Sequence, residues 1–142
     1  MPSALARRRS RFEHEIEMRQ HRLIVDEPEE KGGTDRGPKP AELLAASLAS
    51  CTAITVEMYA DREEWGLGEV EVEVEYAEAG KAGTELPARF DVRIRLGGGL
   101  SEEHQSRILT IAGKCPVHRV LTSESVEVSD SLELIEDIED ED

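Results

Sequence analysis

The chain has 142 residues and a formal net charge of −15, with 38% hydrophobic and only 4% aromatic residues. This length fits one compact domain, and the thin apolar fraction favours a homo-oligomer that completes the core. The negative charge argues against binding to nucleic acid and to anionic membrane surfaces, whose phosphates would repel it. Two cysteines are too few for a disulfide scaffold, and they indicate a reducing, cytoplasmic setting.

The N-terminal part of the sequence predicts an arm, two strands and a loop. Residues 1–11 are predicted as a flexible basic arm, because their four arginines are followed by no apolar segment of the kind found in secretion signals. Apolar residues and glutamates alternate from Phe12 to Met18, which is typical of a half-buried strand. Leu23–Val25 predicts a second strand. Residues 26–40 predict a turn-rich loop, with three prolines and three glycines.

A long apolar helix is predicted next. Pro38 and Pro40 favour its start, since proline is tolerated in a first helical turn. Residues 41–60 are small or apolar on nearly every side, so we expect this helix to be enclosed all round. Its uncharged stretch, residues 43–56, has 14 residues, fewer than the roughly 20 that a membrane span needs. Gly66 and Gly68 end it.

The remaining sequence predicts a hairpin, a second helix and a last strand. Residues 70–76 and 90–96 alternate strictly, and their glutamates and arginines are suited to cross-strand ion pairs. Ser101 predicts the N-cap of a helix that runs towards Cys115. "SVEVSDSLELIE", residues 125–136, predicts a strand, and residues 136–142 an acidic, disordered tail. The order β-β-α-β-β-α-β over residues 12–135 indicates an α+β domain.

The two cysteines lie in distinctive surroundings. Cys51 ends "GPKPAELLAASLASC", and Cys115 lies 64 positions later in "GKCPVHRVL". By pattern alone, a cysteine in an apolar helix is most often an inert core residue. Cys115 before Pro116 has a similar explanation, as a buried residue at a helix kink.

These two segments, together with "HRLIVDEP" and "GGTDRGP", resemble the OsmC/Ohr family of thiol-dependent peroxide reductases, over roughly residues 12 to 130. The resemblance implies an intertwined α+β homodimer, with central helices wrapped by antiparallel sheets. It also implies that Cys51 attacks a hydroperoxide and becomes a sulfenic acid. Cys115 then forms a disulfide with it, and a dithiol reductant restores the pair. No metal, flavin or haem is implied.

Activation of Cys51 needs a charge from elsewhere in the fold. Cys51 lies about three turns into its helix, too far for the dipole at the helix start to lower its pKa. The resemblance implies an arginine from the N-terminal part of the chain, and Arg19, Arg22 and Arg36 are open candidates. His118 could hydrogen-bond a thiol, and His21 could do likewise.

The sequence differs from the family pattern at the position of one glutamate. In the hydroperoxide-specialised branch a glutamate directly follows the proline and orients the arginine, and that position is Ala41 here. Glu42 comes one residue later, which turns a helical side chain by about 100°. The "P-x-E-L-L" form matches less specialised OsmC-like proteins.

The sequence thus predicts a cytoplasmic, homodimeric peroxide reductase with a two-cysteine cycle, acting on organic hydroperoxides or hydrogen peroxide. Its reductant would be a small or protein dithiol. Two alternatives remain open at this point. One is a non-enzymatic thiol redox sensor or ligand-binding dimer on the same scaffold, and the other is a structural dimer with inert thiols.

Overall fold

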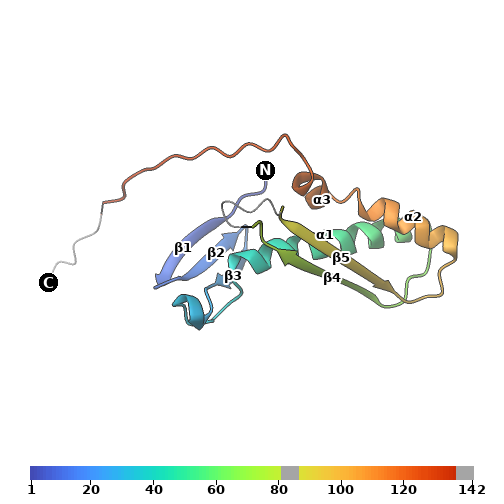
Figure 1. Ribbon diagram of the computed structural model, residues 1–142, viewed down its shortest axis with the longest axis horizontal. Coiled ribbons are helices and arrows are strands. Elements are labelled where there is room, and N and C mark those ends of the chain that lie inside the picture. The colour runs from blue at the N-terminus through green and yellow to red at the C-terminus, as the bar shows by residue number, and fades with distance from the viewer. Residues whose placement is uncertain (81–86, 137–142) are drawn as a thin grey trace.

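The computed structural model describes residues 1–80 and 87–136 of the chain (Figure 1). Two small antiparallel sheets and three helices make up the fold, so the predicted α+β class is confirmed. In chain order the elements are β1 (Leu5–Ser10), β2 (Glu13–Met18), β3 (His21–Val25), a 3₁₀ turn (Glu29–Lys31), α1 (Pro40–Arg62), β4 (Val70–Ala77), β5 (Arg89–Leu96), α2 (Glu102–Ala112) and α3 (Pro116–Leu121).

The first sheet has the order β1-β2-β3, and its first strand corrects a prediction. The segment expected to be a flexible basic arm contains β1, which pairs with β2. Cross-strand ion pairs explain why so basic a segment forms a strand: Arg7 Nη1 lies 3.0 Å from Glu17 Oε2. Arg9 Nε likewise lies 3.4 Å from Glu13 Oε2. Every residue of β1 is nevertheless exposed.

The second sheet is the predicted hairpin of β4 and β5. Its register places Glu71 opposite Arg95 and Glu73 opposite Arg93, so the expected pairing of glutamates with arginines is confirmed. Arg95 donates its Nε–H to Glu71 at 3.0 Å. The opposite face of the hairpin carries its apolar residues towards α1, which packs mainly on β4. The buried core joins Val56 of α1 to Ile108 and Ala112 of α2.

Helix α1 is not enclosed within its own chain. Its buried residues are Leu48, Thr52, Val56 and Ala60, which recur at every fourth position and therefore form one stripe. Other apolar side chains lie open to solvent, with exposed fractions of 49% for Ile54 and 66% for Met58. The prediction of all-round burial is therefore wrong for the single chain. By length and composition alone α1 is long and apolar enough to cross a membrane. Helices in the core of a protein meet the same criterion.

The C-terminal part differs from the prediction in two ways. The helix expected to run towards Cys115 ends at Ala112, and a separate helix, α3, begins at Pro116, because proline cannot continue a helix but is suited to its first turn. Residues 125–136 do not form the predicted strand, since no neighbouring strand in the described chain is there to accept their hydrogen bonds. Their apolar side chains are largely exposed, and the tail beyond residue 136 lies outside the described residues.

The loop before α1 is organised around the buried carboxylate of Asp26. Its oxygens accept the backbone N–H groups of Glu27 at 2.7 Å, Thr34 at 3.3 Å and Arg36 at 3.2 Å, and the Thr34 hydroxyl at 2.8 Å. The Asp26 N–H donates to the Pro38 carbonyl at 3.1 Å, which fixes the loop against the start of α1. Asp26 therefore holds both ends of the loop, through its carboxylate and its backbone N–H.

Replacing Asp26 with asparagine is expected to make the protein less stable near neutral pH but to remove part of its acid sensitivity. Burial acts to raise the pKa of Asp26, but the hydrogen bonds from Arg36, Glu27 and Thr34 outweigh it and lower the pKa below its ordinary value of 3.8. A lowered folded pKa stabilises the fold above about pH 4, and this contribution is lost as the pH falls through the folded value. Urea unfolding from pH 7 to pH 3 should show the difference between wild type and Asp26→Asn shrinking below pH 4. A constant difference would contradict this role.

Candidate functional site

The structure brings Cys51 and Cys115 together at the contact between α1 and α3. Cys51 occupies the middle of α1 and is half-buried, while Cys115 precedes Pro116 and is fully buried. Both thiols are free, and helix α1 packs against α3 so that Cys115 is close enough to Cys51 to raise its pKa. Only Cys51 is therefore open to a substrate, and its nearest sulfur neighbour is the residue expected to form a disulfide with it.

Cys115 is held in place by the break between the last two helices. Its N–H donates to the Ala112 carbonyl at 3.3 Å, at the end of α2. Its sulfur is the N-cap of α3 and accepts the His118 backbone N–H at 3.4 Å. His118 thus reaches the site through its backbone, whereas the sequence suggested a role for its side chain.

The surroundings of Cys51 do not favour its thiolate within the single chain. Burial raises the pKa of Cys51, and the neighbouring Cys115 raises it further through its hydrogen bond and charge. The Val117 backbone N–H and the Thr55 side chain act in the opposite direction and lower the pKa. Sequence reasoning missed both groups. Thr55 could have been found, since it lies four residues after Cys51 on the same helix face.

The other predicted site residues lie away from the two cysteines. Glu42 accepts the Lys39 backbone N–H at 3.0 Å and so caps the start of α1. Arg19 lies exposed in the turn between β2 and β3, with a left-handed φ of 56°. Arg22 pairs with Glu15 at 3.1 Å on the same sheet. None of these side chains shifts the pKa of Cys51 within the described chain.

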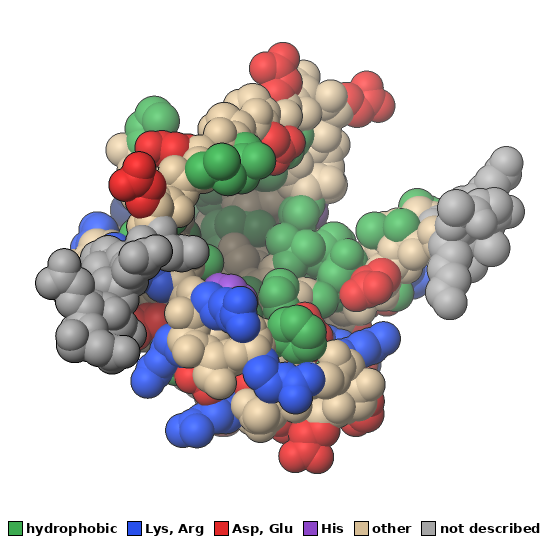
Figure 2. Space-filling view, turned by 90° about the vertical axis from the view of Figure 1, so that its left-hand side faces the viewer, with side chains coloured by type: hydrophobic (Ala, Val, Ile, Leu, Met, Phe, Trp, Pro, Cys, Tyr) green, Lys and Arg blue, Asp and Glu red, His purple; other side chains and the backbone are tan. Residues whose placement is uncertain are grey.

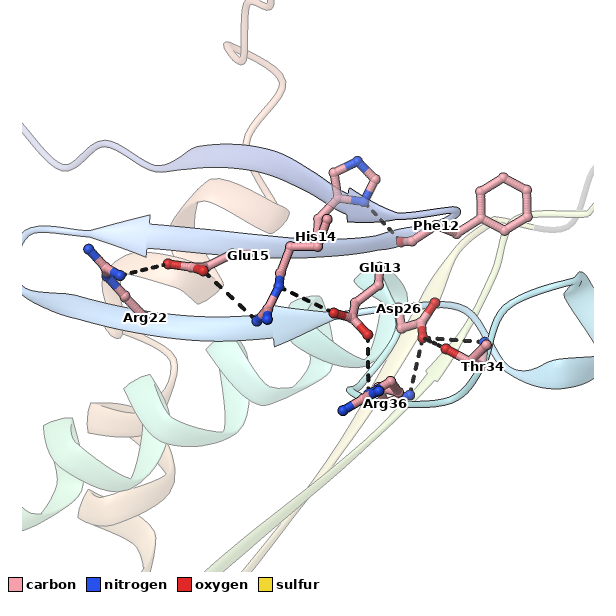
Figure 3. A network of polar contacts seen from close by, with 9 residues as sticks. Phe12, Glu13, His14, Glu15, Arg22, Asp26, Thr34 and Arg36 are labelled. Carbon is pink, nitrogen blue, oxygen red and sulfur yellow. Dashed lines mark hydrogen bonds and ion pairs between the residues drawn. The ribbon is translucent and has the colours of Figure 1, made fainter. Parts of the chain in front are cut away.

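Arg36 belongs to a polar network on the first sheet (Figure 3). Its Nε lies 3.3 Å from the buried carboxylate of Glu13, which also pairs with Arg9. Asp26 holds its backbone N–H, so both ends of the residue are fixed. The Arg36 side chain is nevertheless 72% exposed, so it can meet a surface outside its own chain. No group of three or more residues suited to hold a metal ion occurs in residues 1–80 and 87–136.

Comparison with known proteins decides the family. The family model for OsmC-like proteins matches residues 33–129, a span that includes both cysteines. The chain belongs to the OsmC-like protein family. The OsmC-like resemblance of the sequence is therefore confirmed. No curated protein matches the chain.

Solved structures share the OsmC-like fold at low identity. An OsmC-like protein from Mycoplasma pneumoniae is 18% identical, with a TM-score of 0.74, and the match covers 88% of this chain and 89% of that one. An organic hydroperoxide resistance protein from Legionella pneumophila is 19% identical, with a TM-score of 0.61 and coverage of 84% and 89%. Another from Elizabethkingia anophelis is 16% identical, with a TM-score of 0.68 and coverage of 87% and 89%.

Proposed function

We propose that this protein is a thiol-dependent peroxide reductase with a two-cysteine cycle, acting on organic hydroperoxides or hydrogen peroxide. The observation that carries the proposal is the meeting of Cys51 and Cys115, which are 64 positions apart in the sequence. Two structural relatives are organic hydroperoxide resistance proteins, which supports the same substrate class. The free thiols are consistent with a reducing cytoplasmic location, which is part of the proposal.

The cycle needs no group beyond the two thiols and an external reductant. The Cys51 thiolate attacks one peroxide oxygen, the O–O bond breaks, and the alcohol leaves with a proton while Cys51 becomes a sulfenic acid. The Cys115 thiol attacks that sulfur, forming the disulfide and releasing water. An external dithiol reduces the disulfide by exchange and is itself oxidised to a disulfide. The burial of Cys115 keeps it from the peroxide and reserves it for the second step.

The active form is proposed to be a homodimer. The sheet of β1–β3 makes no more than a marginal contact with the helices and the hairpin of its own chain. Apolar residues of α1 and of residues 125–136 lie exposed, and a view from the end that carries β1–β3 shows hydrophobic side chains in and around a surface hollow (Figure 2). A second copy that covers these surfaces would bury them and give residues 125–136 a strand to pair with.

Peroxide consumption tests the proposed function directly. Reduced protein is mixed with cumene hydroperoxide and an excess of dithiothreitol, and the remaining peroxide is measured over time. The wild type is expected to consume many equivalents per chain, and Cys51→Ser to fall to the rate of the dithiol alone, because a serine hydroxyl is not ionised near neutral pH. Equal rates for the two proteins would overturn the proposal.

A redox sensor is the second candidate function, and the surroundings of Cys51 favour it. Its pKa is raised by burial and by Cys115, and within the described part of a single chain no arginine or lysine acts on it. A sensor would oxidise once per chain and regain its thiols only slowly with the dithiol. The same assay separates the two candidates, since only an enzyme consumes many equivalents.

A further inference from the structure

Strand β5 has one edge that no other strand covers in the described chain, because its sheet holds only β4 and β5. The backbone N–H and C=O groups along such an edge can pair with a further strand. Residues 125–136 are exposed and pair with no strand in the described chain. Figure 1 shows them as an extended trace that leads away from α2 and the hairpin. An open edge and a strand-like segment therefore occur in the same chain without meeting.

An apolar hollow opens on the side of β5 that faces the helices. Its volume is about 450 Å³, and its walls include Ile94 of β5 and Ile108 and Leu109 of α2. Leu109 is 69% exposed, although Ile108 beside it belongs to the buried core. Helix α1 packs mainly on β4, which leaves Val92 of β5 38% exposed on the same side as Ile94. Apolar side chains from a strand at the edge of β5 would cover these residues.

The other side of β5 carries an arginine without an ion pair. The side chains of Arg89 and Arg95 each pair with a carboxylate of their own hairpin. Arg93 lies opposite Glu73 in the register, but it forms no ion pair within the described residues. Its charge is therefore available to a carboxylate on a neighbouring strand.

Residues 125–136 carry the two kinds of side chain that this edge could accept. Valines and leucines alternate with glutamates along the segment, as valines and glutamates do along β4, the strand that already pairs with β5. In an extended chain one side carries the apolar residues Val126, Val128, Leu132 and Leu134. The opposite side carries Glu127 and Glu133, and Asp130 is the one charged residue on the apolar side.

The other edge strands of the described chain fit this segment less well. Along β4 its glutamates would lie beside Glu71, Glu73 and Glu75, and like charges on neighbouring strands repel. Every residue of β1 is exposed, so that strand offers no hollow for valines and leucines. The arginine of β3, Arg22, already pairs with Glu15. Among these edges, β5 combines an arginine without an ion pair on one side with an apolar hollow on the other.

We propose that residues 125–136 of a second copy pair with the open edge of β5, placing their valines and leucines over the hollow and a glutamate beside Arg93. The inference rests on the homodimer of the proposed function, because it names the strand that the second copy supplies and the strand that receives it. A second copy is the occupant, since the segment leads away from the β5 of its own chain (Figure 1). In a symmetric dimer the pairing occurs twice, so each copy covers the hollow of the other.

Two neighbouring residues of the segment give a matched pair of variants. Leu134→Asp places a charge against the hollow and is expected to raise the dissociation constant of the dimer at least about 100-fold, measured by sedimentation velocity over a dilution series. Ile135→Asp is the control, because Ile135 is 90% exposed and lies on the opposite side of the segment. It is expected to change the dissociation constant by no more than about twofold. Equal effects of the two substitutions would overturn the inference.

A charge exchange tests the assignment of Arg93. Glu127→Arg combined with Glu133→Arg is expected to raise the dissociation constant about fivefold or more, because like charges then lie side by side on the two strands. Adding Arg93→Glu to that variant should recover part of the lost affinity. If nothing is recovered, the glutamates lie beside some other group and the assignment to β5 is wrong.

Amide hydrogen exchange distinguishes a second copy from the same chain. The N–H groups of residues 125–136 are expected to be protected at protein concentrations above the dissociation constant and to lose that protection below it. Protection at every concentration would point to the same chain and overturn the inference, as would a wild type that stays monomeric. The measurement uses no peroxide, so a dimer with this protection that consumes no peroxide would sink the proposed reaction and leave the strand pairing standing.

Discussion

Replacing Cys115 with serine is expected to stop the cycle after its first step without slowing that step. Serine still caps α3, because its oxygen can accept the His118 N–H that the sulfur accepts now. A hydroxyl cannot displace water from a sulfenic acid, so the oxidised Cys51 persists. Burial and Cys115 both raise the pKa of Cys51, and the substitution removes the second of these effects. The first oxidation should therefore be at least as fast as in the wild type near pH 7.

One equivalent of cumene hydroperoxide without reductant distinguishes the two proteins. Wild type is expected to lose both thiols per chain and to give no adduct with dimedone, which reacts with sulfenic acids. Cys115→Ser is expected to lose its single thiol and to give a dimedone adduct at Cys51 in nearly every chain. A dimedone adduct in the wild type, with the Cys115 thiol still free, would show that Cys115 does not perform the second step.

Local periodicity was sufficient for the elements that pair or pack within one chain. The alternation of residues 70–76 and 90–96 predicted the hairpin and its ion pairs, and Ser101 predicted the start of α2, where its hydroxyl accepts the His104 N–H at 3.1 Å. The motifs around Cys51 and Cys115 carry the family resemblance, which implies that the two thiols meet. Each of these features depends on neighbours in sequence or on a family pattern.

The features that the sequence did not predict depend on contacts between residues far apart in the chain or on neighbours that carry no motif. Strand β1 forms because arginines that are merely basic in sequence face glutamates of β2 across the sheet. Residues 125–136 have the alternation of a strand but pair with no strand in the part of the chain that the structure describes. Glu42 comes one residue after the position of the family glutamate, and its carboxylate accepts the Lys39 backbone N–H at the start of α1. Thr55 carries no charge or motif, so only its effect on the pKa of Cys51 indicates that it lies near the site.

The second prediction concerns the exposed apolar side chains of α1, which we expect to form part of the proposed dimer interface. Ile54→Glu combined with Met58→Glu is expected to dissociate the proposed dimer, raising its dissociation constant at least about 100-fold. These side chains lie one turn apart and are largely exposed in the single chain. An unpaired charge buried in an apolar contact costs about 3 kcal/mol or more. Ile54→Leu with Met58→Leu keeps the face apolar and should stay dimeric. Sedimentation velocity over a dilution series measures the change, and an unchanged dissociation constant would contradict this interface.

The same variant tests where the activating charge comes from. Arg19, Arg22 and Arg36 all lie in or beside a sheet that barely contacts its own helices, and none acts on the Cys51 of its own chain. If a partner's sheet delivers one of them, dissociation leaves the two thiols together but removes the cation that favours the thiolate. Alkylation of Cys51 at pH 7 should then slow by about tenfold in the glutamate variant, in step with dissociation. An equally fast reaction in the monomer would mean that α1 and α3 alone activate the thiol.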